Sequence, residues 1–162
     1  MSGALLNFAS WLENTRLALA IADSSWAYPY VQLTHFVGLS LWVGTNVAVD
    51  LSLIGVGKGW QTPSEVSEAL IVWNWIGFAI AVAGGLMLFA ASATTYVINP
   101  AFLVKLGVLI PLAFVCHVVI QGKVHGWCQK PNLSPLAKLI GLTELVLWLA
   151  VITAAVLIPF VA

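Results

Sequence analysis

The chain has 162 residues, of which 61% are hydrophobic and only 7% are charged. Soluble domains are about one quarter charged, so this composition excludes an ordinary soluble protein and indicates a single integral membrane domain over residues 1–162. Because the formal net charge is zero, no basic surface for nucleic acid is expected. The hydrolase and nucleotide-binding motifs that sequence patterns can reveal are also missing.

The first segment, residues 3–22, has apolar residues at spacings that suit an amphipathic helix, and Glu13 and Arg16 interrupt the apolar positions; the apolar residues are Leu5, Leu6, Phe8, Trp11, Leu12 and Leu19. This pattern predicts an amphipathic helical segment that lies in the membrane interface before the first span. A lid packed on the mouth of the bundle is the alternative. Since the segment lacks a basic start, a cleavable signal peptide is not expected.

Four apolar stretches follow, each near or above the roughly 20 residues that cross about 30 Å of hydrocarbon. We predict spans over residues 28–56, 66–92, 100–121 and 136–160. Their connections are short, so neighbouring helices should be antiparallel. The predicted fold class is therefore all-α, an integral membrane four-helix bundle with an N-terminal interfacial amphipathic helix.

Local signals mark where these helices begin and where they are disturbed. Capping side chains followed by proline occur at Thr62-Pro63, with Glu65 completing a capping box, at Asn99-Pro100 and at Ser134-Pro135. Pro111 removes a backbone donor inside the third span and should kink it. A stripe of small residues in the second span either brings two helix backbones close together or leaves room for a flat ligand; it comprises Gly77, Ala81, Gly84 and Ala91.

The distribution of basic residues predicts the orientation in the membrane. One end of the bundle carries Lys58, Lys123, Lys130 and Lys138, whereas the other carries Arg16, with Lys105 just inside the third span. Because cytoplasmic loops are enriched in lysine and arginine, the lysine-rich end should face the cytoplasm. We therefore expect a multi-pass protein of the bacterial cytoplasmic (inner) membrane with both termini in the periplasm.

The first span carries polar side chains along one face of an otherwise apolar helix. At about 100° per residue, several polar or aromatic residues fall within roughly 60° of His35, namely Tyr28, Gln32, Trp42, Asn46 and Asp50. Ionisable groups at this depth are costly in lipid and usually face a bundle interior, a cavity or a cofactor. We expect the other helices to surround this stripe.

His35 and Lys105 form the first candidate site, because both are expected about 8–10 Å outside the membrane midplane on parallel spans. Imidazole is a common axial ligand of haem iron, and the lysine would bind a propionate or act as a second ligand. Gly38, one turn from His35, would leave space for a ring. In the alternative interpretation His35 bonds to a backbone carbonyl or to Tyr96, and Lys105 extends toward the outer headgroups.

A second candidate site is a polar cluster of four residues from four spans, all expected in the cytoplasmic half: Asp50, Asn74, His117 and Glu144. Two carboxylates and an imidazole would relay protons or bind a cation. The alternative is a satisfied hydrogen-bond network that fixes helix register. Because His117 and His35 fall in opposite leaflets, one haem held by both histidines is disfavoured. His125, Trp127 and Cys128 are expected in a solvated loop.

Two motifs resemble known families. The pattern His35-x-x-Gly38-x-x-x-Trp42-x-Gly44 resembles the first-helix motif of HemJ-type protoporphyrinogen oxidases and of the copper-resistance protein CopD. The segment 99–106, NPAFLVKL, followed by His117, resembles the third-helix pattern of HemJ. In that family a first-helix histidine and a third-helix lysine are associated with haem binding and activity. The resemblance implies that His35 and Lys105 have these roles here.

A further resemblance covers almost the whole chain. It is to a bacterial family of four-helix membrane proteins defined only as a domain of unknown function, and it supplies no activity. The matching segments are Tyr28-Pro29-Tyr30, His35, Asp50-Leu51, Ala93-Thr94-Thr95-Tyr96 and Asn99-Pro100-Ala101-Phe102.

Three functions are therefore consistent with the sequence. The leading hypothesis is a haem b-binding protein of electron transfer or porphyrin-linked redox chemistry, with His35 as the iron ligand and Lys105, Gly38 and Trp42 beside the cofactor. The second is a non-enzymatic subunit or anchor that contacts the lipid bilayer and a larger membrane complex, or a second copy of itself. The third is a small proton or cation pathway through Asp50, His117 and Glu144.

Overall fold

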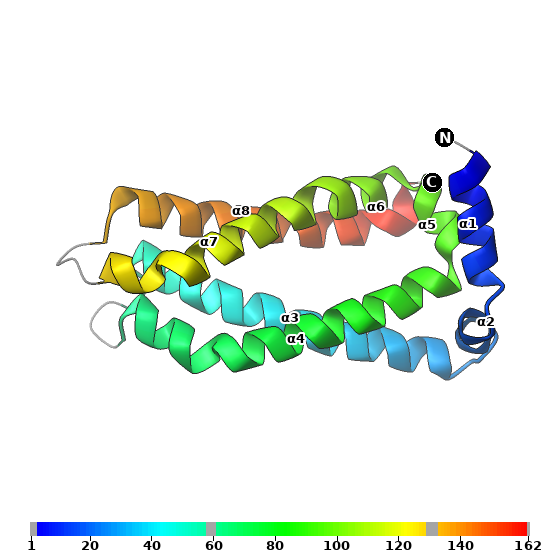
Figure 1. Cartoon of the computed structure of the whole chain (residues 1–162), viewed down its shortest axis with the longest axis horizontal. Helices are drawn as coiled ribbons and strands as arrows, with labels where there is room; N and C mark the ends of the chain where they lie inside the picture. Colours follow the sequence, from blue (N-terminus) through cyan, green and yellow to red (C-terminus); the bar gives the residue numbers. More distant parts are fainter. Residues whose placement is uncertain (1–2, 58–60, 129–132, 162) are drawn as a thin grey trace.

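The computed structural model describes residues 3–57, 61–128 and 133–161, and within these ranges it is helical with no strand. Four long helical spans lie side by side, and two short helices cross one end of the bundle (Figure 1). The chain order is α1 (Gly3–Glu13), α2 (Arg16–Ala22), α3 (Ala27–Ile54), α4 (Pro63–Ala91), α5 (Ala93–Ile98), α6 (Pro100–Val104), η1 (Lys105–Leu109), α7 (Ile110–Cys128), α8 (Pro135–Leu157) and η2 (Ile158–Phe160). This confirms the all-α four-helix bundle.

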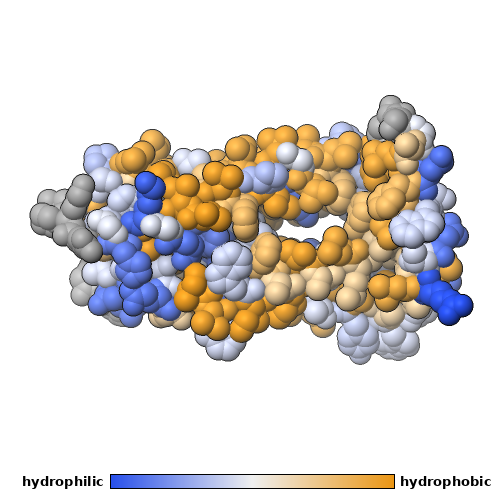
Figure 2. Space-filling view, in the orientation of Figure 1, coloured by the Kyte–Doolittle hydropathy of each residue, from blue (hydrophilic) through white to orange (hydrophobic). Residues whose placement is uncertain are grey.

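The apolar surface of the four spans fits a lipid environment. Each span is long and apolar enough to cross a membrane. Hydrophobic side chains cover much of the middle of the molecule, whereas hydrophilic ones gather toward its two ends (Figure 2). Exposed leucine, isoleucine and valine side chains are frequent on all four spans. The protein is therefore a multi-pass membrane protein with bilayer contact around its middle.

The predicted caps start three of the spans. Thr62 and Glu65 form a complete capping box at the start of α4, with Pro63 in the first turn. The Asn99 side chain accepts a hydrogen bond from Phe102 N at 3.0 Å, and the Ser134 hydroxyl accepts one from Ala137 N at 3.2 Å. Each cap satisfies a backbone N–H that the helix itself leaves without a partner.

The third span is longer than expected. It continues to Cys128 instead of ending at 121, so His125 and Trp127 lie on a helix and the expected loop at these residues is corrected. The reason is tertiary, because the His125 imidazole bonds to Ser64 of α4 and this contact supports another two turns of helix. The short helix α5 between the second and third spans is also additional to the expected elements.

The irregularity expected at Pro111 takes the form of a wide turn. Before the proline, Lys105–Leu109 form a π-helical turn in which Ile110 N donates to Lys105 O. Pro111 has no N–H to give to the preceding turn, and wide turns of this kind are common at functional positions in helices. Lys105, the first residue of this turn, is one of the candidate site residues.

Small residues join α3 and α4 at backbone contact distance. A Cβ added to Gly77 would lie 2.5 Å from Trp42 N, and one added to Gly38 would lie 2.5 Å from Ala81 N. The stripe therefore serves helix packing along this pair. The space beside Gly38 is taken by the backbone of α4, which corrects the expectation that Gly38 leaves room for a ring.

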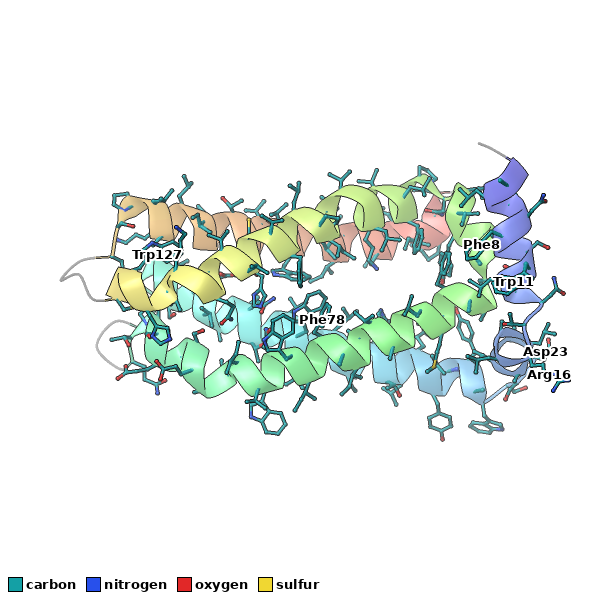
Figure 3. The ribbon with its side chains drawn as sticks, viewed as in Figure 1. Phe8, Trp11, Arg16, Asp23, Phe78 and Trp127 are labelled. Carbon is teal, nitrogen blue, oxygen red and sulfur yellow. The ribbon has the colours of Figure 1, made fainter. Side chains whose placement is uncertain are left out.

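The N-terminal helices are fixed on the end of the bundle (Figure 3). Ala9 packs with Ala93 and Val97 of α5 in a small buried core. The Glu13 carboxylate accepts hydrogen bonds from Thr94 N and Oγ1, both at 2.9 Å. Phe8 and Trp11 of the same helix are not part of this core and remain exposed. Residues 3–22 thus pack on the bundle end, as the alternative of a lid expected, and their position in the membrane interface stays a prediction.

Candidate functional site

An aromatic layer crosses the middle of the bundle and separates two candidate regions. The Trp42 ring lies edge-on to Phe78 and Trp148, with ring centroids 4.9 and 4.7 Å apart. Phe78 in turn lies 5.8 Å from Phe114 of α7 and points into the space between the helix pairs (Figure 3). The four rings come from α3, α4, α7 and α8, so they close the core at this level.

Outside this layer the helix pairs separate. The pair α3–α4 packs on α7 and α8, but in the described chain neither α3 nor α4 makes comparable contacts with α6 or η1. Figure 2 shows an opening between α4 and the helices above it, on the side of the aromatic layer that faces α5. The outer half of the bundle is therefore hollow, and its end is covered by α5 and α1.

His35 is held on the face of α3 that packs against α4. Its Nδ1–H donates a hydrogen bond of 2.7 Å to the carbonyl oxygen of Ala81. Two glycines make room for the ring, since a Cβ on Gly84 would lie 2.9 Å from His35 Cβ and one on Gly85 would lie 3.1 Å from Cε1. With the proton on Nδ1, the neutral ring keeps its lone pair on Nε2, which has no hydrogen-bond partner among the described residues.

Lys105 is the charged group that lies within electrostatic range of His35. It is half-buried at the start of η1, on the opposite helix pair. No carboxylate lies within ion-pair distance of its amine in the part of the chain that the structure describes. A cation without a partner at this depth favours an anionic or electron-rich group between the two side chains.

Aromatic residues line the outer end near α5. Tyr96 stacks with Phe89 at 6.3 Å, and its ring centroid lies 5.0 Å from that of Phe102. Burial, together with the neighbouring Tyr28 hydroxyl, raises the pKa of Tyr96 to about 12. Tyr96 therefore stays neutral at physiological pH. His35 bonds to a backbone carbonyl, as one branch of the alternative interpretation expected, and Tyr96 is not its hydrogen-bond partner.

The four predicted cluster residues lie on the inner side of the aromatic layer, and all four are buried. Asp50, Asn74, His117 and Glu144 are each exposed by 2% or less. Helices α3 and α8 meet closely here, because a Cβ on Gly141 would lie 3.4 Å from Asp50 O. Glu144, one turn further along α8, lies within electrostatic range of Asp50. The fold therefore places two carboxyl groups in one desolvated region.

One half of this cluster is connected through Glu144. The Trp148 indole N–H donates a hydrogen bond of 3.0 Å to Glu144 Oε1. The same oxygen lies 3.5 Å from His117 Nδ1, which is an ion-pair distance when the imidazole is protonated. A buried carboxylate with one indole donor and one imidazole is better stabilised than an isolated one.

The other half joins α3 to α4 through amide groups. The Asn74 side-chain NH₂ donates to Asn46 Oδ1 and, at 2.8 Å, to Thr45 Oγ1. Several buried polar atoms near them have no partner within the described residues: Trp42 Nε1, Asn46 Nδ2, both carboxylate oxygens of Asp50, Asn74 Oδ1 and His117 Nε2. Six such atoms in one region exceed what a satisfied structural network would leave.

A metal ion is not supported at the inner cluster. No group of three or more histidine, cysteine or acidic side chains is arranged to hold one in residues 3–57, 61–128 and 133–161. Cys116 and Cys128 are both free thiols. The described side chains of the inner cluster thus do not form a ready-made set of three metal ligands.

Sequence reasoning missed several residues of both regions. No sequence pattern marks Ala81 as a partner of His35, because a backbone carbonyl can come from any residue type. The close contact between Gly85 and the His35 ring is likewise not marked by any pattern. Trp148 was missed as well. Its four-residue spacing from Glu144 on one helix face is a signal that would have found it.

The fold and these two regions define the class of protein as a multi-pass α-helical membrane protein with ionisable groups inside its bundle. Comparison of the chain with protein-family models, with curated proteins and with solved structures finds no match. The assignment of a function therefore depends on the site itself.

Proposed function

We propose that this protein binds haem b in the outer half of its bundle and acts in electron transfer or porphyrin-linked redox chemistry in the bacterial cytoplasmic membrane. The observation that carries the proposal is the state of His35. Its Nδ1–H is bonded to the Ala81 carbonyl, so Nε2 is left with a free lone pair. Histidines that bind metals usually donate their other ring N–H to a carbonyl or carboxylate in this way.

Lys105 supports the same location from the opposite helix pair. An ammonium group without a carboxylate partner suits a haem propionate, and a neutral amine suits the second axial position. The opening between α4 and the α6–η1 side offers space that the packed glycine stripe does not (Figure 2). Bound there, haem would supply one-electron redox chemistry, and the chain would supply a ligand, a cation and exclusion of water.

Trp42 was expected to lie beside the cofactor, but its contacts suggest a different role. It is buried in the aromatic layer and contacts Phe78 and Trp148, so it forms the floor of the outer region. Gly38 is packed against α4 and does not face open space. The proposed site therefore consists of His35 and Lys105, with the Ala81 carbonyl and Gly85 positioning the imidazole.

Absorption spectra of the purified full-length protein test the proposal. Protein from cells supplied with a haem precursor should show a Soret band that shifts on reduction. His35→Ala should lose the band, because the iron loses its ligand. His125→Ala should keep the band, because His125 lies in the last turn of α7, at the opposite end of the bundle from the proposed site. Wild-type protein without a Soret band, or a band unchanged in His35→Ala, would contradict haem binding at this site.

A further inference from the structure

A row of polar side chains on α7 runs from the buried cluster toward the lysine-rich end. His117, Gln121 and His125 are spaced four residues apart, so they lie on one face of the helix. Their exposure rises along the row, from a buried His117 to a half-buried Gln121 and a His125 side chain that is 63% exposed. The proposed haem site uses none of these residues.

Helix α4 supplies polar partners for the two outer members of this row, Gln121 and His125. The Ser67 hydroxyl donates to Gln121 Oε1 at 3.1 Å. One turn nearer the surface, Ser64 Oγ lies 2.5 Å from His125 Nδ1, and Glu68 Oε1 lies 3.4 Å from the same nitrogen. The interface between α4 and α7 is thus polar from the inner surface to the level of Gln121, one turn from His117.

At the deep end of this row, several polar groups have no protein partner. Both oxygens of Asp50 and Nε2 of His117 are unpartnered among the described residues, and both side chains are at least 98% buried. Asn46 Nδ2 and Asn74 Oδ1 add a donor and an acceptor. Buried polar atoms in this number are normally satisfied by internal water, which also conducts protons between side chains.

The charge balance of this region indicates what the deep end holds. The titratable groups that face each other are Asp50 of α3, His117 and the Cys116 thiol of α7, and Glu144 of α8, whereas α4 contributes only the neutral Asn74. Two carboxylates face one imidazole, and no lysine or arginine of the described ranges 3–57, 61–128 and 133–161 forms an ion pair with them. Two like charges in a desolvated site are strongly disfavoured, so a proton shared by the two carboxyl groups lowers the cost of burying them together.

We propose that this row is a proton path between water at the lysine-rich end and the buried pair Asp50–Glu144. A proton enters at His125 and Glu68, passes Gln121 and Ser67 through water, and reaches His117 and the carboxyl pair. At the final step an N–H or O–H bond of the donor breaks and an O–H bond forms on one carboxylate oxygen. The carboxylate oxygen that accepts this proton has first released one, so the pair returns to a single negative charge, and nothing is oxidised or reduced. The proposal does not depend on haem binding.

Infrared spectroscopy of the full-length protein in lipid vesicles tests both parts of the proposal. The spectrum should contain the carbonyl band of a protonated carboxyl group buried in the protein. The band should shift when aspartate is labelled with carbon-13 at its side-chain carboxyl, or disappear in Asp50→Asn or Glu144→Gln. Because the isotope label is placed in the wild-type protein, this measurement works even if the substituted variants do not fold. A spectrum without such a band would overturn the proposed protonated pair.

The path itself is tested by the rate at which this band shifts after transfer to heavy water. Gln121→Leu and Ser67→Ala should each slow the shift by about tenfold or more, because they interrupt the polar row between the surface and His117. Thr143→Val is the matched control, since its exposed hydroxyl donates to Leu139 O of its own helix and to no other helix among the described residues. An equal exchange rate in wild type, Gln121→Leu and Ser67→Ala would overturn the path.

Discussion

At the scale of single residues, glycine has opposite roles at different positions of the same helix pair. Gly77 faces the backbone of α3, where a Cβ would lie 2.5 Å from Trp42 N. Gly44 lies on the exposed side of α3, where an added Cβ would have no neighbour within 4 Å. The same chemical change therefore has opposite consequences at the two positions.

We predict that Gly77→Ala destabilises the protein by about 1–3 kcal/mol, because the methyl group forces α3 and α4 apart in a packed interface. Gly44→Ala, the control, should be neutral or stabilise by up to about 1 kcal/mol, since alanine favours the helix and meets no neighbour. Unfolding of both variants in a denaturing-detergent titration measures the free energies. Equal effects of the two substitutions would contradict the close packing at Gly77.

The three histidines differ in their neighbours, and these neighbours determine which chemistry each imidazole suits. His35 donates to a carbonyl and keeps a free lone pair, whereas His117 lies beside a carboxylate and His125 beside a serine and a glutamate. The first arrangement suits an iron ligand, and the other two suit proton exchange. These differences come from neighbours on other helices, so the residue type alone does not reveal them.

At the scale of elements, the N-terminal helices are attached to the bundle by a small number of contacts. Helix α1 has a small buried core with α5 and a carboxylate that satisfies Thr94 N at the start of that helix. A glutamate that accepts from both the backbone and the hydroxyl of one residue fixes the angle between the two helices. Helix α1 also covers the end of the outer region in which we place the haem (Figure 1).

We predict that Glu13→Ala loosens α1 from α5 while the four spans remain folded. Loss of a charge-assisted bond to a partly buried backbone N–H typically costs about 1.5–3 kcal/mol. Hydrogen exchange of the amides in α1 and α5 should therefore become faster, with little change in α3 and α4. Asn14→Ala is the control, because its exposed side chain bonds only to Ser10 O. Unchanged exchange in Glu13→Ala would show that the apolar contacts alone hold α1.

At the scale of the whole molecule, the bundle is asymmetric along its long axis. One end carries α1, α2 and α5 as a cover, whereas at the other end α3 and α7 finish, α4 and α8 begin, and His125, Glu68 and Lys123 are exposed. The outer half opens between helix pairs, and the inner half is closed around buried polar groups. The proposed haem and the proposed proton path thus occupy opposite halves of one bundle.

The lysine distribution predicts that the end with α1 and α2 is periplasmic. In a background with both cysteines replaced by serine, Asn14→Cys should react with a membrane-impermeant maleimide in intact cells. Gln61→Cys, which is exposed at the opposite end, should react only after the membrane is permeabilised. The reverse labelling pattern would show the inverted orientation, and would place the entrance of the proton path outside the cell.

The sequence determined the properties that act within one helix. Span length, apolar composition and the caps at Thr62, Asn99 and Ser134 depend on neighbouring residues along the chain, so the bundle and its helix starts were predictable. The polar stripe of α3 was predictable in the same way. It is buried at Trp42, Asn46 and Asp50, but Gln32 is exposed.

Only the tertiary structure decided which groups meet. The backbone of α4 fills the space beside Gly38, the Ala81 carbonyl accepts a hydrogen bond from His35 Nδ1–H, and Ser64 holds His125 on a helix extended to Cys128. These contacts depend on helix rotation, on interhelical distance and on the wide turn before Pro111. Hydrophobicity along the chain does not fix these quantities, because lipid accepts any apolar face and only packing between helices selects one.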